Sequence, residues 1–201
     1  MSIIITAPHS LCYDLSYRNC DSASLVASQR LAELLYKFGV QIKYFPANYH
    51  RSEIDLNRLE ARNTDYRQSL TSTLEDSALL IDVHSFPYGA FNVNQAIRIN
   101  VGVGYNDNSD NERDVKSGSS INVAVLDNLP GTWEGNLLYE IMVNHNIPVG
   151  YYYGGQENDI VTEARSVGLR SIIIEYGEFL SLDYIDSINL AVLEWVGTIM
   201  D

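Results

Sequence analysis

Short apolar runs alternate along the chain with longer segments of mixed polarity. The isoleucine runs at 3–5 and 172–174 have the length and the β-branched content of buried strands. On the same grounds we expect strands over residues 3–6, 41–45, 77–83, 97–103, 122–126, 149–153 and 171–175.

The segments between these runs carry apolar residues at helical spacing. We expect helices over residues 21–38, 54–73, 132–144, 160–166 and 181–200. In the first helix Leu25, Ala32, Leu35 and Tyr36 are the expected apolar positions. Asp21 lies in a stretch of N-capping residues, and Gly39 ends the helix.

Strands that alternate with helices predict an α/β fold. We expect one domain over residues 1–201, built as a three-layer sandwich with helices on both faces of a mostly parallel, mixed sheet. Part of the sheet should be antiparallel, because 97–127 has strands with no helix between them. Within it, residues 104–120 are rich in Asn, Asp, Ser and Gly and predict a loop.

Charge and composition limit the function classes. A net charge of −13 argues against nucleic acid and anionic membrane surfaces as partners. No apolar run approaches the ~20 residues of a membrane span, and no basic region precedes the first strand as in a signal peptide. Two cysteines give no disulfide framework, so we expect a cytoplasmic protein.

Two short strings place a histidine at the end of a predicted strand. These are Ala7-Pro8-His9-Ser10 and Asp82-Val83-His84-Ser85. A third strand ends in Glu175. In an open parallel sheet the carboxyl ends of the strands open into one crevice, where ligands bind. Two imidazoles and a carboxylate delivered there predict a metal-assisted hydrolase.

The residues leave the third metal ligand open. Asp21 is one candidate, with an N-cap as the alternative role. Asp14 and Cys12 are the others, although a buried free thiol is the simpler interpretation of Cys12. Glu175, partly desolvated after three isoleucines, suits a general base, with a structural ion pair as the alternative. Glu178 is expected to be solvated.

The densest polar cluster of the chain lies at residues 50–58. Arg58 offers a planar guanidinium for a substrate carboxylate, Asn57 a neutral donor, and Asp55 a partner that holds an arginine in place. The alternative is a charged helix start with a capping role.

Taken together, these strings resemble the N-formylglutamate amidohydrolase family, which is related in fold to zinc carboxypeptidases and to the succinylglutamate desuccinylase and aspartoacylase group. The resemblance spans residues 8–178. It rests on Pro8-His9-Ser10, on Asp55-Leu56-Asn57-Arg58 preceded by Arg51, on Asp82-Val83-His84-Ser85, and on Tyr152-Tyr153-Gly154-Gly155 with Ile174-Glu175.

The resemblance implies a phosphorylase/hydrolase-like sandwich with one zinc ion per chain. It places the ion on His9, His84 and a carboxylate, carried onto Asp21, and makes Glu175 the base that deprotonates water. Asn57 and Arg58 then hold the substrate carboxylate, and Arg51 polarises the scissile carbonyl. The His-x-x-Glu ligand pair of the carboxypeptidases is absent, since Cys12 occupies the Glu position. The chain is also short for the family.

We therefore expect a zinc hydrolase that cleaves an amide bond in a small substrate with a free carboxylate, such as an N-acyl amino acid or a short peptide. One alternative is a carboxypeptidase-type peptidase acting on peptides or cell-wall fragments. The other is a non-catalytic binding protein on the same fold.

Overall fold

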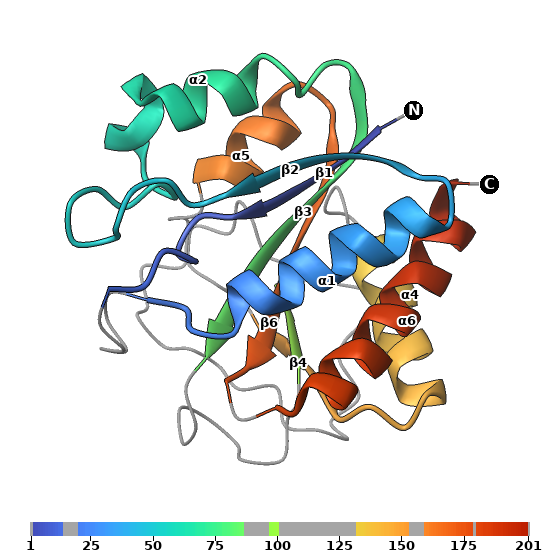
Figure 1. The fold of residues 1–201 in the computed structure, drawn as a ribbon. Helices are drawn as coiled ribbons and strands as arrows, with labels where there is room; N and C mark the ends of the chain where they lie inside the picture. The colour runs from blue at the N-terminus through green and yellow to red at the C-terminus, as the bar shows by residue number, and fades with distance from the viewer. Residues whose placement is uncertain are drawn as a thin grey trace.

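The strands that the structure describes form one six-stranded sheet (Figure 1). The computed structural model describes residues 2–13, 20–86, 97–100, 132–152, 159–178 and 180–200. In spatial order the strands are β2 (Gln41–Pro46), β1 (Ser2–Ala7), β3 (Ser77–Phe86), β6 (Arg170–Gly177), β4 (Ile97–Asn100) and β5 (Val149–Tyr152). The first four are parallel, whereas β4 is antiparallel to β6. The expected mixed, mostly parallel sheet is confirmed.

Helices cover both faces of this sheet (Figure 1). One face carries α1 (Ser24–Lys37), α4 (Thr132–Asn144) and α6 (Leu182–Met200). The other carries the 3₁₀ helix η1 (Leu59–Asn63), α2 (Asp65–Thr71) and α5 (Asp159–Ser166). The result is the three-layer α/β sandwich that the sequence predicts.

Alternation along the central strands builds two cores, one on each face. In β1, Ile3 and Ile5 pack with the α1, α4 and α6 layer, whereas Ile4 packs with the α2 and α5 layer. Successive side chains of a strand point to opposite faces. A strand buried on both faces therefore needs an unbroken apolar run, which explains the isoleucine runs at 3–5 and 172–174.

Two helical segments differ from the predictions. The helix expected over 54–73 is divided: residues 51–58 form turns, η1 follows, and α2 begins only after Thr64, whose hydroxyl accepts from the backbone N–H of Arg67. In α1 the buried face consists of Ser24, Ala27, Ser28, Leu31 and Leu35. Leu25 and Tyr36 are exposed. Small side chains on the inner face explain the error, because they let the helix pack closely while some larger apolar residues face solvent.

Several predictions lie outside the described residues. These are the loop at 104–120, the strand at 122–126, the last residues of the strands at 97–103 and 149–153, Asp14, and the Tyr153-Gly154-Gly155 part of the family resemblance.

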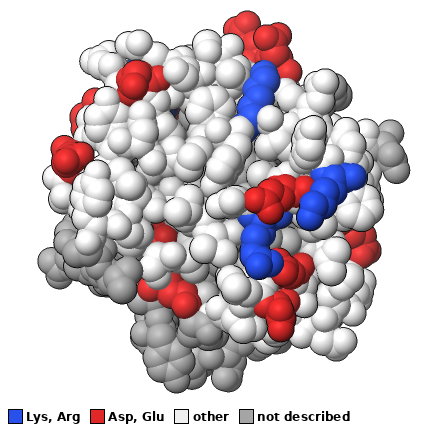
Figure 2. Space-filling model, viewed as in Figure 1, with Lys and Arg blue, Asp and Glu red and all other residues white. Residues whose placement is uncertain are grey.

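Acidic side chains are scattered over the face shown in Figure 2, and the few basic ones lie near acidic ones. Arg30 of α1 pairs with Asp186 of α6 at 2.5 Å. None of the helices in the described part of the chain combines the length and the apolar content of a transmembrane helix.

Candidate metal centre

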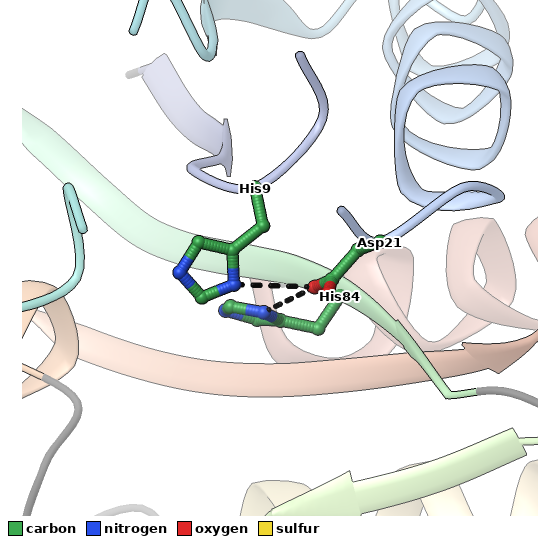
Figure 3. Close-up of side chains that lie close together, drawn as sticks. All are labelled: His9, Asp21 and His84. Carbon is green, nitrogen blue, oxygen red and sulfur yellow. Dashed lines mark hydrogen bonds and ion pairs between the residues drawn. The ribbon is translucent and has the colours of Figure 1, made fainter. Parts of the chain in front are cut away.

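Two histidines and an aspartate lie together at the carboxyl ends of β1 and β3 (Figure 3). His9 follows β1, His84 lies near the end of β3, and Asp21 precedes α1. One ligand atom from each residue lies within 4.8 Å of the others, and all three side chains are buried. Oδ2 of Asp21 is 2.8 Å from Nδ1 of His84 and 3.3 Å from Nδ1 of His9. The structure thus brings together the two strand-end histidines and Asp21, the carboxylate that the family resemblance assigns to the metal.

Asp21 reaches the histidines because the chain after His9 returns to its starting point. The backbone N–H of Asp21 donates to the carbonyl of His9 at 3.1 Å, and a disulfide joins Cys12 to Cys20. The expectation of a free Cys12 thiol is therefore wrong. The disulfide also argues against Cys12 as a ligand, since a metal binds the thiolate form of cysteine.

The other nitrogen of each imidazole contacts a second carboxylate. Nε2 of His9 lies 2.7 Å from Oδ1 of Asp55, and Nε2 of His84 lies 3.0 Å from Oδ2 of Asp82. Both rings thus present Nδ1 to Asp21 and Nε2 to an outer carboxylate, an arrangement typical of metal-binding histidines. Nδ1 of His9 is buried, and its ion-pair contact with Asp21 at 3.3 Å does not have hydrogen-bond geometry. This unsatisfied nitrogen, beside a second imidazole and a carboxylate, fits a zinc ion.

The proximity of these groups shifts their pKa values. Burial raises the pKa of Asp21, but the charge of His9 and the hydrogen bond with His84 outweigh it and hold that pKa far below its ordinary value. Burial also opposes the charge of His84, yet Asp82 and Asp21 hold its pKa well above the usual range. Without a metal, the two carboxylates therefore favour the imidazolium form of His84. A divalent cation must displace its proton to bind.

Asp55 connects the histidines to the two arginines predicted to act on substrate. Its Oδ2 lies 3.2 Å from Nε of Arg51 and 3.3 Å from Nε of Arg58. Arg51 also approaches Asp21, with Nη1 3.9 Å from Oδ1. Both guanidiniums are partly exposed, so they lie between the buried histidines and the solvent. The expectation that Asp55 holds an arginine is confirmed, and its contact with His9 is an addition.

Asn57 faces the buried side of the cluster. Its Nδ2 is 3.2 Å from Nε2 of His84 and 3.4 Å from Oδ2 of Asp82, and its Oδ1 accepts from the backbone N–H of Ile160 at 3.3 Å. These contacts tie the turn at residues 51–58 to the start of α5. The amide therefore supports the histidine layer, and its direct contact with substrate stays a prediction.

Glu175 lies on the strand next to His84. The two residues are register partners in the parallel pair β3–β6, so their side chains leave the same face of the sheet. Glu175 is half-buried. The structure thus places a carboxylate beside the candidate ligands, at the end of the strand where the sequence predicts it.

Glu178, expected to be solvated, is half-buried and hydrogen-bonded. Its Oε1 accepts from the backbone N–H of Ser22 at 3.0 Å and from the hydroxyl of Ser85 at 3.1 Å. Ser85 Oγ in turn accepts from the N–H of Ala23 at 3.3 Å. Ser85 of β3 and Glu178, the residue after β6, therefore satisfy N–H groups just before α1, and Asp21 turns its carboxylate to the histidines instead of taking the alternative role of a cap.

Asp82, which contacts Nε2 of His84, is an addition to the site residues predicted from the sequence. A signal was present: Asp82 precedes His84 by two positions in a predicted strand, and that spacing puts both side chains on one face.

Comparison with known proteins gives no match to a protein-family model and none to a curated protein sequence. The N-formylglutamate amidohydrolase resemblance thus has no support from either comparison.

Several solved structures with a similar fold carry the names of hydrolases. An N-acetylmuramoyl-L-alanine amidase of Nostoc punctiforme matches with a TM-score of 0.60 and 11% identity, over 99% of this chain and 97% of that one. A similar amidase from Clostridium difficile 630 gives a TM-score of 0.55 and 11% identity, over 100% of this chain and 97% of that one. A D,L-carboxypeptidase of Helicobacter pylori gives 0.54 and 12%, over 98% of this chain and 50% of that one. At these identities the likeness shows the fold.

The shifted pKa values predict how the stability of the metal-free protein depends on pH. The pKa of His84 is higher in the folded state than in the unfolded state, so its contribution is complete below about pH 6.5 and is lost as the pH rises through the folded value. The pKa values of Asp21 and Asp55 are lower in the folded state, so their contribution is lost as the pH falls below about 4. We expect maximal stability between these limits.

Urea unfolding in the presence of a chelator measures this dependence. The free energy of unfolding should decline on the alkaline side, and the decline should be smaller in His84→Asn, which cannot titrate. A wild-type protein whose stability stays constant from pH 6 to 9 contradicts the prediction.

Proposed function

We propose that the chain, as one domain over residues 1–201, is a zinc-dependent hydrolase that cleaves an amide bond in a small substrate with a free carboxylate. The observation that carries the proposal is the orientation of the two histidines. Both turn Nδ1 to Asp21 and Nε2 to an outer carboxylate, and the contact of His9 Nδ1 with Asp21 does not have hydrogen-bond geometry. The likeness in fold to amidases and to a D,L-carboxypeptidase supports the reaction class.

His9, Asp21 and His84 would hold the zinc ion, which supplies a Lewis acid that polarises the scissile carbonyl and acidifies water. Glu175, beside His84, takes a proton from the attacking water. Oxygen bonds to the carbonyl carbon, the C–N bond breaks, and Glu175 returns the proton to the leaving amine. The products are a carboxylic acid and an amine.

The two arginines on Asp55 orient the substrate in this proposal. Each guanidinium has its Nε near Oδ2 of Asp55, which restricts the direction of the side chain. A restrained guanidinium suits a carboxylate, because its planar donors match two oxygens. Arg58 binds the substrate carboxylate. Arg51, which also approaches Asp21, donates to the oxygen of the scissile carbonyl.

N-Acyl amino acids are the first substrates to test, with N-formylglutamate among them. Peptides and cell-wall fragments are the second group, because the neighbours in fold include N-acetylmuramoyl-L-alanine amidases and a D,L-carboxypeptidase. The cytoplasmic location was expected because two cysteines give no disulfide framework. The two cysteines do form a disulfide, and such bonds are typical of oxidising compartments, so the cysteine count no longer supports that location.

Glu175→Gln should lower kcat by about 10²–10⁴-fold, the usual effect of losing a general base. The zinc content and the melting temperature should stay at wild-type values. Glu60→Gln makes the same chemical change at an exposed position and serves as the control. Full activity of Glu175→Gln would remove this residue from the mechanism, and loss of zinc would make it a ligand.

Arg58→Lys should reduce kcat/KM by about tenfold or more on a free-acid substrate, because lysine keeps the charge but loses the paired donors. For the amidated form of that substrate, kcat/KM of the wild type should be low, and the substitution should leave it unchanged. Arg62→Lys is the matched control, since Arg62 is exposed and pairs with Asp159. Equal turnover of acid and amide by the wild-type enzyme would exclude a carboxylate clamp.

A further inference from the structure

Asp82 carries a carboxylate that is completely buried in the sheet layer. Its Oδ1 accepts from the hydroxyl of Thr6 at 2.6 Å, and its Oδ2 lies 3.0 Å from Nε2 of His84. Nδ2 of Asn57 approaches the same Oδ2 at 3.4 Å. Each carboxylate oxygen therefore has its own partner: Thr6 on β1 for Oδ1 and the candidate metal ligand His84 for Oδ2.

The register of the sheet produces this arrangement. Thr6 and Asp82 are partners in the parallel pair β1–β3, so their side chains leave the same face next to each other. His84 is two residues further along β3 and faces the same side. The hydroxyl of Thr6 fixes one oxygen of Asp82, and the carboxylate plane then directs the other oxygen to Nε2 of His84.

A buried carboxylate is costly for a protein unless every oxygen is paired. Stability alone would be served by an apolar side chain at position 82, as at its neighbours Ile81 and Val83. The charge does, however, have a consequence for the ligand. A carboxylate on Nε2 keeps the proton on that nitrogen and leaves Nδ1 to face Asp21.

We propose that Asp82 and Thr6 are positioning residues that together set the metal affinity of the site through the orientation of His84. Asp82 holds the ring, and Thr6 acts only through Asp82. This role rests on the proposed function, because it gives His84 a metal to bind. Neither residue touches substrate.

The test compares four variants with the wild type. Asp82→Asn removes the charge, Thr6→Val removes the hydroxyl at nearly constant shape, Thr6→Ser retains the hydroxyl, and a double variant combines Asp82→Asn with Thr6→Val. Tyr176→Phe is the control for loss of a buried hydrogen bond, since Tyr176 donates to Asn189 on the opposite face of the sheet. Zinc affinity is measured by competition with a chelator.

Asp82→Asn should weaken zinc binding by about 10–100-fold, the usual effect of losing an outer carboxylate. Thr6→Val should weaken zinc binding less than Asp82→Asn does, and Thr6→Ser, which keeps the hydroxyl, should bind zinc as the wild type does. The double variant should bind zinc as Asp82→Asn does, because in the described part of the chain the hydroxyl of Thr6 bonds to Asp82 and acts through it. Tyr176→Phe should lose stability without losing affinity. Unchanged affinity in Asp82→Asn, or additive losses in the double variant, overturns the proposal.

Proton NMR of the Hε2 atom of His84 gives a second readout that needs no activity. The wild type should show a downfield Hε2 signal with and without metal, and Asp82→Asn should shift it upfield. If the wild type binds no zinc, the proposed function fails. The Hε2 signal of the metal-free protein still decides whether Asp82 orients His84: a shift in Asp82→Asn supports this orientation, and an unchanged signal refutes it.

Discussion

The carboxylate of Asp21 between two imidazoles is the contact on which the site depends. It joins three separate parts of the chain: the end of β1, the start of α1 and the end of β3. A buried carboxylate and a buried imidazolium stabilise each other only when they meet at close range, and either one alone is costly. Contacts in the surrounding structure hold Asp21 beside the two histidines. A backbone hydrogen bond and a disulfide close the segment between His9 and Asp21, and Glu178 with Ser85 holds the residues that follow Asp21.

The fold was largely predictable because burial on both faces of a parallel sheet leaves a strong signal in the sequence. The isoleucine runs at 3–5 and 172–174 are central strands, and the two strand-end histidines meet as expected. The helix positions were less predictable. Residues 51–58 form turns in place of the predicted helix, and the side chains of Asp55 and Asn57 contact His9 and His84. No local sequence pattern encodes contacts with residues so distant in sequence.

The disulfide and the outer carboxylate Asp82 show two kinds of missing information. Two cysteines separated by eight residues are compatible with thiols or with a bond, and only the return of the chain to His9 decides between them. Asp82 could be seen in the sequence within a predicted buried strand. Its role could not be predicted, because it depends on Thr6 in the neighbouring strand. At 11–12% identity, hydrolases share this fold without a detectable family match, so the geometry of the site carries the functional proposal.

The central claim is that His9, Asp21 and His84 bind one zinc ion, and elemental analysis of the purified protein tests it most directly. The account predicts about one zinc per chain in the wild type, and a content well below one in His9→Ala and in His84→Ala, with circular dichroism unchanged. His145→Ala, which alters an exposed histidine paired with Glu194, should keep the full zinc content. A wild-type protein that retains no metal after loading with zinc, or full zinc content in both site variants, would contradict the account.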